Sequence, residues 1–219
     1  MNQTVLDVKN LKTEFINDKK AFPIIKDVNF KLERGKVLGI VGESGCGKSV
    51  TVNTVLNLLP KNGRIAEGEI TYFDEDKPIE LQKLKQYGKE FRKLRGEKIS
   101  MIFQDPMSAL NPVYTIGNQI TEVLFEHYDI SKEEANKRAI EMLEKLGIHN
   151  AKERMNDYPH QFSGGQRQRI VIAIAMVCNP DILIADEPTT ALDVTIQAQI
   201  LDLLDELRKE HGTSIILIT

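Results

Sequence analysis

The sequence lacks tryptophan, has only two cysteines among 219 residues and carries a formal net charge of -3. Cys46 and Cys178 lie far apart and lack metal-ligand spacing, so they predict neither a disulfide nor a metal site and favour a reduced, cytosolic protein. The near balance of charge gives no general reason to expect nucleic acid as a partner. No run approaches the ~18 apolar residues of a membrane span, and residues 1–10 lack the apolar core of a signal peptide. We therefore expect a soluble protein, which can still sit on a membrane protein.

Hydrophobic patterning predicts an α/β fold. The chain length suits one large domain. Polar and apolar residues alternate over residues 5–15 and 24–32, which predicts half-exposed antiparallel strands near the N-terminus. Continuous apolar runs at 37–41, 182–185 and 215–218 are typical of buried parallel strands, and helices between them imply right-handed crossovers. We expect a mostly parallel sheet with an N-terminal antiparallel part.

The middle of the chain predicts a helical insertion. Helical periodicity runs over residues 116–126 and again over 135–146, where Gly147 stops it. The string Ser131-Lys132-Glu133-Glu134 predicts a capping box at the start of the second helix. We expect residues 105–162 to form a small helical subdomain, inserted into a core made of residues 1–104 and 163–219.

A phosphate loop is predicted between the apolar run at 37–41 and a helix at 48–59. Its residues, Gly42-Glu43-Ser44-Gly45-Cys46-Gly47-Lys48-Ser49, fit the pattern G-x-x-x-x-G-K-[ST]. The glycines let successive N–H groups face β-phosphate oxygens, Lys48 supplies charge for the β- and γ-phosphates, and the Ser49 hydroxyl suits Mg²⁺. We expect this loop and Val50 to bind nucleotide. Cys46 reads either as a small filler or as a redox-sensitive thiol.

Two adjacent carboxylates end the apolar run at 182–185. Neighbouring strand residues point in different directions, so Asp186 and Glu187 are expected to serve different roles. We expect Asp186 to serve the metal and Glu187 to act as the base that polarises water for in-line attack on a γ-phosphate.

A second anion cradle is predicted at Ser163-Gly164-Gly165, which opens a helix at 166–177 with free N–H groups, a hydroxyl and the helix dipole. Alone, this tripeptide would more often be a capped helix start. In order with the phosphate loop, Gln104 and Asp186-Glu187, it resembles the ABC transporter ATPase family over nearly the whole chain.

That resemblance implies a shared site. In this family two ATPase domains close head to tail, so Ser163, Gly164, Gly165 and Gln166 would meet the γ-phosphate held by a partner, either a second copy or a different subunit. Gln104 is similar to the glutamine that meets Mg²⁺ and the attacking water. Thr190-Ala191-Leu192-Asp193 resembles the loop that crosses the dimer interface. Phe15 takes the place of the aromatic residue that stacks on adenine, with Phe22 or simple core packing as the alternatives.

Two further strings, at 103–112 and 158–166, look like those of the peptide and nickel importers. The resemblance implies an ATPase on the cytoplasmic face of the membrane, with permease subunits docked on the helical lobe and an extracytoplasmic binding protein as an indirect partner. Dipeptides or oligopeptides are the first expectation for the cargo, and nickel or glutathione the alternative. One phosphate loop and a compact lobe argue against relatives that act on nucleic acid or ribosomes.

The match departs from the family at its end. The family's switch histidine directly follows the strand that corresponds to residues 215–219, and none of His127, His149, His160 and His211 lies at that position. On this pattern we expect a shortened chain, lacking the end of the family fold, that keeps nucleotide binding and has weak or no hydrolysis. A nucleotide-binding module with little turnover is therefore the alternative function.

Overall fold

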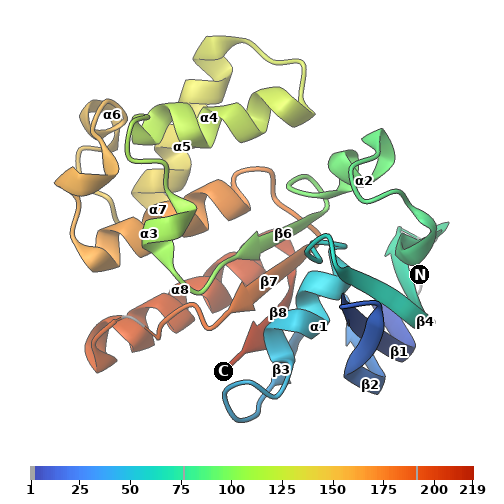
Figure 1. Ribbon diagram of the computed structural model, residues 1–219. Helices are drawn as coiled ribbons and strands as arrows, with labels where there is room; N and C mark the ends of the chain where they lie inside the picture. Colours follow the sequence, from blue (N-terminus) through green and yellow to red (C-terminus); the bar gives the residue numbers. More distant parts are fainter. Residues whose placement is uncertain (1–2, 76, 191) are drawn as a thin grey trace.

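An antiparallel sheet and a parallel sheet lie next to each other in the computed structural model, and helices cover the far side of the parallel sheet (Figure 1). The structure describes residues 3–75, 77–190 and 192–219. The predicted α/β architecture, with its antiparallel and parallel parts, is confirmed.

The antiparallel sheet contains both strands predicted near the N-terminus. Its strands are β1 (Thr4–Asn17), β2 (Lys20–Glu33), β4 (Gly63–Asp74) and β5 (Lys77–Glu80), in the order β2-β1-β4-β5. β1 and β2 extend beyond the predicted segments because a two-residue turn joins them. Asp18 and Lys19 adopt φ of 48° and 63° there, the conformation that tight hairpin turns need at both central positions.

The second sheet is parallel. It contains β3 (Val37–Ile40), β8 (Ser214–Ile218), β7 (Ile182–Asp186) and β6 (Ile99–Ile102), side by side in that order. β7 is buried along its whole length, as its apolar run predicts. β3 differs from that expectation, since Val37 is 48% exposed. The strand lies at the edge of the sheet with one neighbouring strand, so an equally apolar run is covered on fewer sides.

The helices follow the predicted pattern with shifted ends. They are α1 (Lys48–Val55), the 3₁₀ helix η1 (Leu81–Lys83), α2 (Lys89–Leu94), α3 (Pro106–Ala109), α4 (Ile116–His127), α5 (Lys132–Lys145), α6 (Ala151–Arg154), the 3₁₀ helix η2 (Pro159–Gln161), α7 (Gly164–Met176) and α8 (Val194–His211). α1 ends at Val55, before the predicted Leu59, and Asn57 takes a left-handed φ of 50°.

The start of α5 forms half of its predicted capping box. Ser131 Oγ accepts a hydrogen bond from the Glu134 N–H at 3.2 Å. The Glu134 carboxylate accepts instead from Arg138 Nε at 2.9 Å, one turn along the helix. Gly147, with φ of 74°, ends the helix as predicted.

Side chains of the central strand β7 alternate between two apolar cores. Ile182 and Ile184 pack with the antiparallel sheet and α1, whereas Leu183 and Ala185 pack with the helices on the other face. This is the period of two that a strand imposes. β7 therefore runs through the middle of the layers, and the carboxylates at its end are fixed by packing on both faces.

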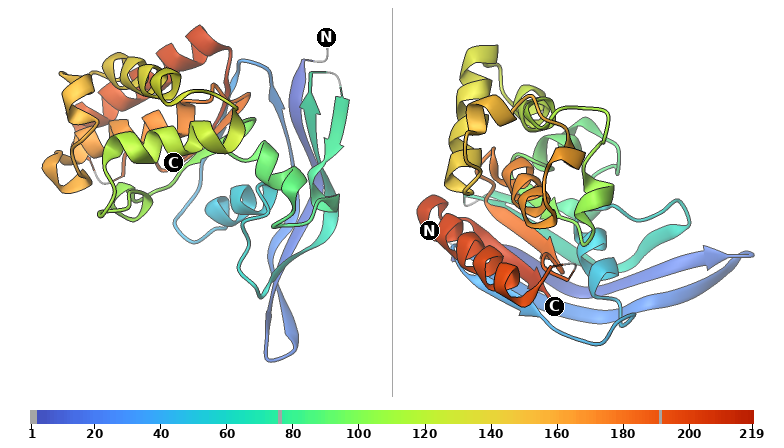
Figure 2. Two further views of the ribbon diagram at one scale, coloured as in Figure 1. Left: turned by 90° about the horizontal axis from the view of Figure 1, so that it is seen from above. Right: turned by 90° about the vertical axis from the view of Figure 1, so that its left-hand side faces the viewer.

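Helices α3 to α6 form a lobe beside the parallel sheet (Figure 2). Its core is continuous with the rest, since Ile120 of α4 and Ala139 of α5 belong to one cluster with Ile172 of α7 and Leu183 of β7. The division into a core and a helical subdomain at residues 105–162 therefore stays a proposal, with α7 as the shared packing element.

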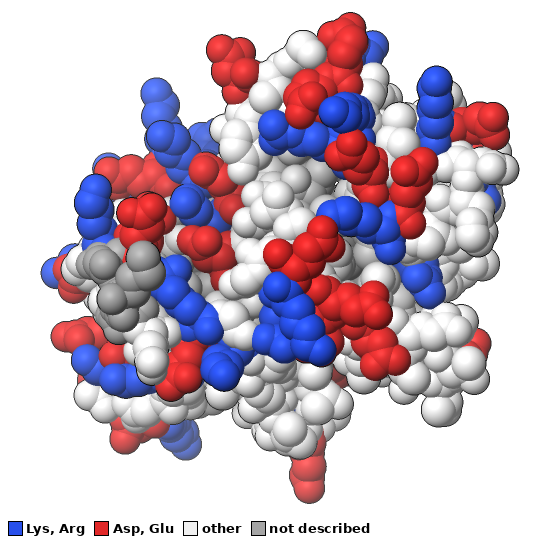
Figure 3. Space-filling model, turned by 180° about the vertical axis from the view of Figure 1, so that it is seen from behind, with Lys and Arg blue, Asp and Glu red and all other residues white. Residues whose placement is uncertain are grey.

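The surface carries both charge signs. On the rear face, Lys and Arg side chains alternate with Asp and Glu side chains without one large patch of either sign (Figure 3). Within the part of the chain that the structure describes, no helix has both the length and the apolar character to cross a membrane.

Candidate functional site

The predicted phosphate loop joins the carboxyl end of β3 to the start of α1. Gly45 and Gly47 have φ of 80° and 99°, values that residues with a side chain rarely adopt. A Cβ at Gly42 would lie 2.8 Å from Cys46 Sγ, and one at Gly47 would lie 2.8 Å from Ile25 Cδ1. The loop therefore needs glycine at positions 45 and 47 for its backbone shape, and it leads into a helix N-terminus, where N–H groups suit an anion.

Lys48 is held inside this loop. Its side chain is 8% exposed, and Nζ donates to the Gly42 carbonyl at 2.7 Å and to the Glu43 carbonyl at 3.2 Å. Nζ also lies 3.8 Å from Glu187 Oε1. The ammonium thus lies between the loop backbone and the end of β7, as a cation for phosphate should.

Asp186 ends β7 and is only 5% exposed. Ser49 Oγ donates to Asp186 Oδ1 at 3.0 Å, so the two residues predicted to serve Mg²⁺ lie in direct contact. Burial raises the pKa of Asp186 above its ordinary value; the hydrogen bond from Ser49 lowers it, the Glu187 carboxylate raises it, and the Lys48 ammonium lowers it. A bound cation would relieve the cost of keeping this carboxylate ionised.

Glu187 is the meeting point of three segments. Gln104 Nε2, just after β6, donates to Glu187 Oε2 at 2.8 Å. Thr190 Oγ1 donates to the same oxygen at 3.1 Å, and the Lys48 ammonium lies by the other oxygen. The Glu187 N–H donates to the Ile218 carbonyl of β8 at 3.1 Å, which fixes the backbone.

The backbone of Glu187 is strained, with φ of 46°. Left-handed φ at a residue with a side chain is uncommon and gathers at functional sites. No sequence pattern signals this conformation. The hydroxyl contact from Thr190 was also missed, since the resemblance marks that threonine only as part of an interface loop.

The second cradle forms a complete capping box at the start of α7. Ser163 Oγ accepts from the Gln166 N–H at 3.3 Å, and Gln166 Oε1 accepts from the Ser163 N–H at 3.0 Å. A Cβ at Gly165 would lie 3.2 Å from Ile196 Cγ2 of α8, so glycine lets these helices approach closely. In Figure 1, α7 begins toward the left of the molecule, whereas α1 lies right of the centre.

Two arginines hold the residue that precedes this cradle. The guanidinium of Arg154 lies 4.0 Å from the ring centre of Phe162, which is buried. Arg154 Nη2 donates to the Gln161 carbonyl at 3.1 Å, and Arg167 Nη1 donates to the Phe162 carbonyl. The entry into the cradle is therefore fixed, while Ser163 itself is exposed.

The remaining predicted residues have local roles in the structure. Asp193 caps α8 by accepting from the Ile196 N–H at 3.1 Å, and Ala191 of the same loop lies outside the described residues. Phe15 pairs with Phe22 across β1 and β2, and its ring lies against Gly63, where a Cβ would be 2.9 Å from Phe15 Cε1. Adenine stacking by Phe15 stays a prediction beside this packing contact.

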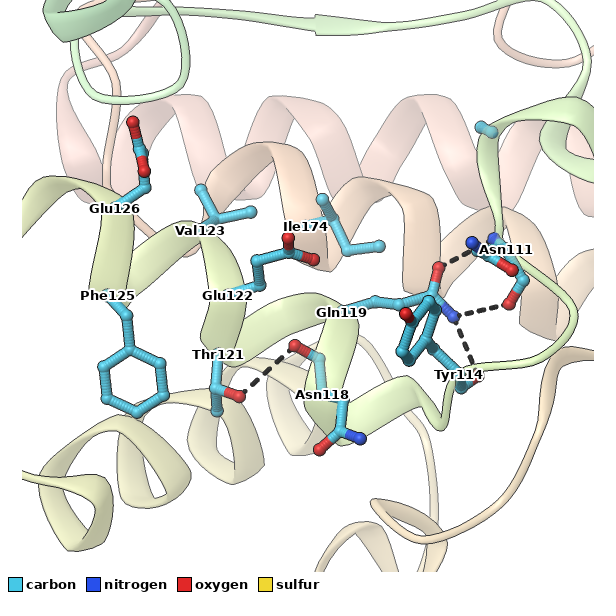
Figure 4. Close-up of a pocket in the computed structure, with 11 residues that line it drawn as sticks. Asn111, Tyr114, Asn118, Gln119, Thr121, Glu122, Val123, Phe125, Glu126 and Ile174 are labelled. Atoms are coloured by element: carbon cyan, nitrogen blue, oxygen red, sulfur yellow. Dashed lines mark hydrogen bonds between the residues drawn. The ribbon is translucent and has the colours of Figure 1, made fainter.

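A groove runs along α4 beside the segment that follows Gln104 (Figure 4). It is lined by Ala109, Asn111, Tyr114, Asn118, Gln119, Thr121, Glu122, Val123, Phe125, Glu126 and Ile174. The Gln119 side chain braces one wall: its Nε2 donates to the carbonyls of Asn111 and Tyr114, both at 3.0 Å. The exposed ring of Phe125 and the exposed carboxylates Glu122 and Glu126 give the groove an apolar and acidic character.

Comparison with known proteins places these features in one family. The family model of ABC transporters matches residues 25–190. The chain is 48% identical to the oligopeptide transport ATP-binding protein AppD of Bacillus subtilis (strain 168), covering 99% of this chain and 64% of that relative. It is 53% identical to the oligopeptide transport ATP-binding protein OppD of the same organism, covering 98% of this chain and 59% of the relative. The chain thus spans about 60% of the length of these relatives.

A solved structure agrees with this assignment. The ATP-binding cassette MJ0796, determined as a dimer in a post-hydrolysis state bound to ADP and Pi, superposes with a TM-score of 0.82 at 32% identity. The match covers 98% of this chain and 87% of that chain. The resemblance drawn from the sequence motifs is confirmed: this chain belongs to the ABC transporter family.

Proposed function

We propose that this chain binds ATP and, in the assembled transporter, hydrolyses it to power an ABC importer of dipeptides or oligopeptides; a nucleotide-binding module with little turnover is the alternative. The proposal rests on two contacts between the phosphate loop and the carboxylates at the end of β7: Ser49 contacts Asp186, and Lys48 contacts Glu187. The names of relatives, oligopeptide transport ATP-binding proteins, support the cargo. Nickel or glutathione remains the alternative, since the residues assigned to this site are assigned to nucleotide and Mg²⁺ and not to the cargo.

The residues present fit a magnesium ion. Ser49 Oγ and Asp186 Oδ1, which lie 3.0 Å apart, are the first two proposed oxygen ligands of the metal, and the Gln104 amide oxygen is the proposed third. Among the described residues no group of three or more His, Cys, Asp or Glu side chains could hold a metal by itself. Mg²⁺ suits such a sparse site, because it usually takes one or two protein carboxylates together with phosphate oxygens and water. When bound, the ion neutralises charge on the β- and γ-phosphate oxygens.

Glu187 is the proposed general base. Hydrogen bonds from Gln104 and Thr190 fix its Oε2, so the carboxylate can orient a water for in-line attack on the γ-phosphorus. The water gives its proton to Glu187 as the new P–O bond forms and the bond to the ADP oxygen breaks. Lys48 offsets the negative charge that reaches the β-phosphate oxygens.

The second cradle is proposed to act on ATP held by another subunit. Ser163 Oγ accepts from its own helix, and a hydroxyl that accepts one hydrogen bond still has its proton to donate to a phosphate oxygen. Gly164, Gly165 and Gln166 add N–H groups at the helix N-terminus. The dimeric state of the similar cassette MJ0796 supports such an arrangement.

The groove along α4 is the proposed docking site of the membrane-spanning subunits, and the cytoplasmic face of the membrane is the proposed location of this chain. The groove adjoins the segment after Gln104, and Gln104 contacts Glu187. A movement of the groove wall caused by a docked subunit would therefore be transmitted to the proposed base, Glu187, through the side chain of Gln104. The extracytoplasmic binding protein would act through the membrane subunits alone.

Nucleotide binding tests the proposal directly. Binding of a fluorescent ATP analogue with Mg²⁺ should weaken about 10- to 100-fold in Lys48→Met, because a charge-assisted hydrogen bond contributes about 1.5–3 kcal/mol. Lys61→Met is the matched control, since Lys61 is an exposed lysine. Equal affinity of wild type and Lys48→Met would refute the proposed site. In the assembled transporter, ATP turnover that rises with a peptide-loaded binding protein, and not with a nickel-loaded one, would support the peptide cargo.

A further inference from the structure

Cations gather on the outer side of α2 and the turn before it. We name the exposed residues Lys85, Tyr87, Lys89, Arg92 and Lys93 the α2 patch. The Tyr87 ring is 71% exposed. Over residues 84–94 the exposed acid is Glu90, so the patch is strongly basic on a chain whose net charge is -3.

The α2 patch is held in place from its inner side. Phe91 is fully buried and Leu94 is 9% exposed, so α2 has an apolar inner face. Arg95 Nε donates to the Leu56 carbonyl at 2.9 Å, and Gln86 Nε2 donates to the Leu59 carbonyl at 2.8 Å. The guanidinium of Arg95 also lies 4.2 Å from the ring centre of Phe91. The backbone that carries the outward-facing cations is therefore fixed to the rest of the chain.

The α2 patch continues the face that carries the groove along α4. Glu126 lines that groove and also lines the hollow that Lys89, Arg92 and Lys93 share with His127. α2 lies beside the end of α4 in Figures 1 and 2. A membrane subunit seated in the groove would therefore bring the α2 patch near the bilayer surface.

The charges along this face bear on what the α2 patch can bind. Cytoplasmic loops of membrane proteins carry an excess of Lys and Arg. Such loops suit the acidic groove, with Glu122 and Glu126, and repel the basic α2 patch. Acidic phospholipid headgroups give the cytoplasmic membrane surface a negative charge that attracts basic clusters, and Tyr side chains favour the same interface.

We infer that the α2 patch binds acidic phospholipid headgroups and orients the docked subunit on the membrane. This rests on the proposed function, because membrane subunits docked in the groove would hold the patch at the bilayer. Each basic side chain near an acidic membrane adds attraction, which weakens beyond a Debye length of about 10 Å at 0.1 M salt. The contact should therefore be salt-sensitive and independent of ATP.

Flotation of the purified chain with vesicles tests the inference. With vesicles of 70% phosphatidylcholine and 30% phosphatidylglycerol at low salt, the chain should bind at least tenfold more than with pure phosphatidylcholine. The variant Lys85→Gln, Lys89→Gln, Arg92→Gln, Lys93→Gln should lose that difference. The control variant Lys19→Gln, Lys20→Gln, Lys26→Gln, Lys36→Gln removes the same number of exposed cations elsewhere and should keep it.

Equal binding to both kinds of vesicle, or equal loss in both variants, would overturn the inference. It would also be overturned if the α2 variant bound vesicles normally but failed to assemble with membrane subunits in detergent, which would assign the patch to a protein surface. Fluorescent ATP binding, measured in the same preparations, separates the two proposals: normal ATP binding without vesicle binding rejects the lipid contact alone.

Discussion

Two segments of this chain place glycines at the start of a helix, and only one of them meets further functional side chains. The phosphate loop at Gly42–Ser49 precedes α1, whose N-cap Gly47 offers no side chain. Its Lys48 and Ser49 contact the carboxylates at the end of β7. The cradle at Ser163–Gln166 forms the N-cap and first turn of α7 and closes on itself as a capping box.

The difference teaches which segment can do chemistry within one chain. The phosphate loop has a buried carboxylate and a proposed base within hydrogen-bond or ion-pair distance. The cradle approaches α8 of its own chain and is exposed at Ser163, so it is open to the anion that another subunit is proposed to supply. Changes in the first segment should therefore alter turnover, and changes in the second should alter assembly.

The largest effect is expected at the base. Glu187→Gln keeps the size of the side chain and removes its ability to take a proton, so phosphate release should fall about 10²- to 10⁴-fold, the usual contribution of a positioned base. ATP binding should persist, and the ATP-bound dimer should accumulate because it is no longer consumed. Steady-state phosphate release and light scattering measure the two outcomes in the assembled ATPase.

The control for this change is Glu144→Gln, at an exposed carboxylate on α5, which should leave the rate within twofold. A Glu187→Gln rate within tenfold of wild type would show that another group accepts the proton. The conclusion that the phosphate loop and its neighbour Glu187 determine turnover would then be wrong.

A smaller effect on the chain itself is expected in the cradle. Ser163→Arg places a bulky cation at an exposed helix start, so it should block ATP-dependent dimer formation, measured by sedimentation. Nucleotide affinity of the isolated chain should change less than twofold, since the phosphate loop lies elsewhere. The lost cap should reduce the free energy of unfolding by about 1 kcal/mol.

Ser131→Arg separates the loss of a cap from the loss of a phosphate contact. Ser131 caps α5 through the same kind of hydrogen bond, to Glu134 N–H at 3.2 Å. It should cost similar stability and leave the dimer intact. Equal loss of dimer in both variants would mean that stability alone explains the Ser163 result.

Sequence patterns predict this site unevenly, for physical reasons. The pairing of Ser49 with Asp186 follows from parallel strands, whose carboxyl ends meet at one edge of a sheet. The box at Ser163 and Gln166 is local and follows from two side chains three residues apart. The left-handed backbone at Glu187 is accompanied by a hydrogen bond from its N–H to the Ile218 carbonyl, and no local pattern encodes a contact so distant in the chain. The contact with Thr190 is local, three residues away, but the resemblance marks that threonine only as part of an interface loop.

Burial was predicted less well than strand position. β3 and β7 have equally apolar sequences, yet β7 is central and buried whereas β3 is an edge strand with Val37 half exposed. Order within a sheet is decided by long-range packing, so apolar content alone cannot give it. The patterns also failed to predict β6, a four-residue strand that brings Gln104 to Glu187.

The smallest effect is expected at Asp186, and it concerns stability. Burial raises the pKa of Asp186 in the folded chain above the unfolded value of about 3.9. The folded state therefore holds this proton to higher pH, and the free energy of unfolding falls as pH rises from the unfolded pKa to the folded pKa. Above that window the ionised carboxylate destabilises the nucleotide-free chain.

Asp186→Asn removes that cost and keeps an oxygen that accepts from Ser49, so Tm without nucleotide should rise slightly at pH 7. The gain should disappear as the pH falls below the unfolded pKa, where the wild-type carboxyl is neutral. Asp202→Asn, at an exposed position of α8, should leave Tm unchanged at both pH values. With Mg²⁺ and ATP the order should reverse, since the variant lacks the charge that holds the ion and gains less stability from the ligand. An Asp186→Asn variant that is less stable than wild type at pH 7 without nucleotide would contradict this prediction. It would mean that the interactions of the Asp186 carboxylate with Ser49 and Lys48 stabilise the nucleotide-free chain by more than its burial costs.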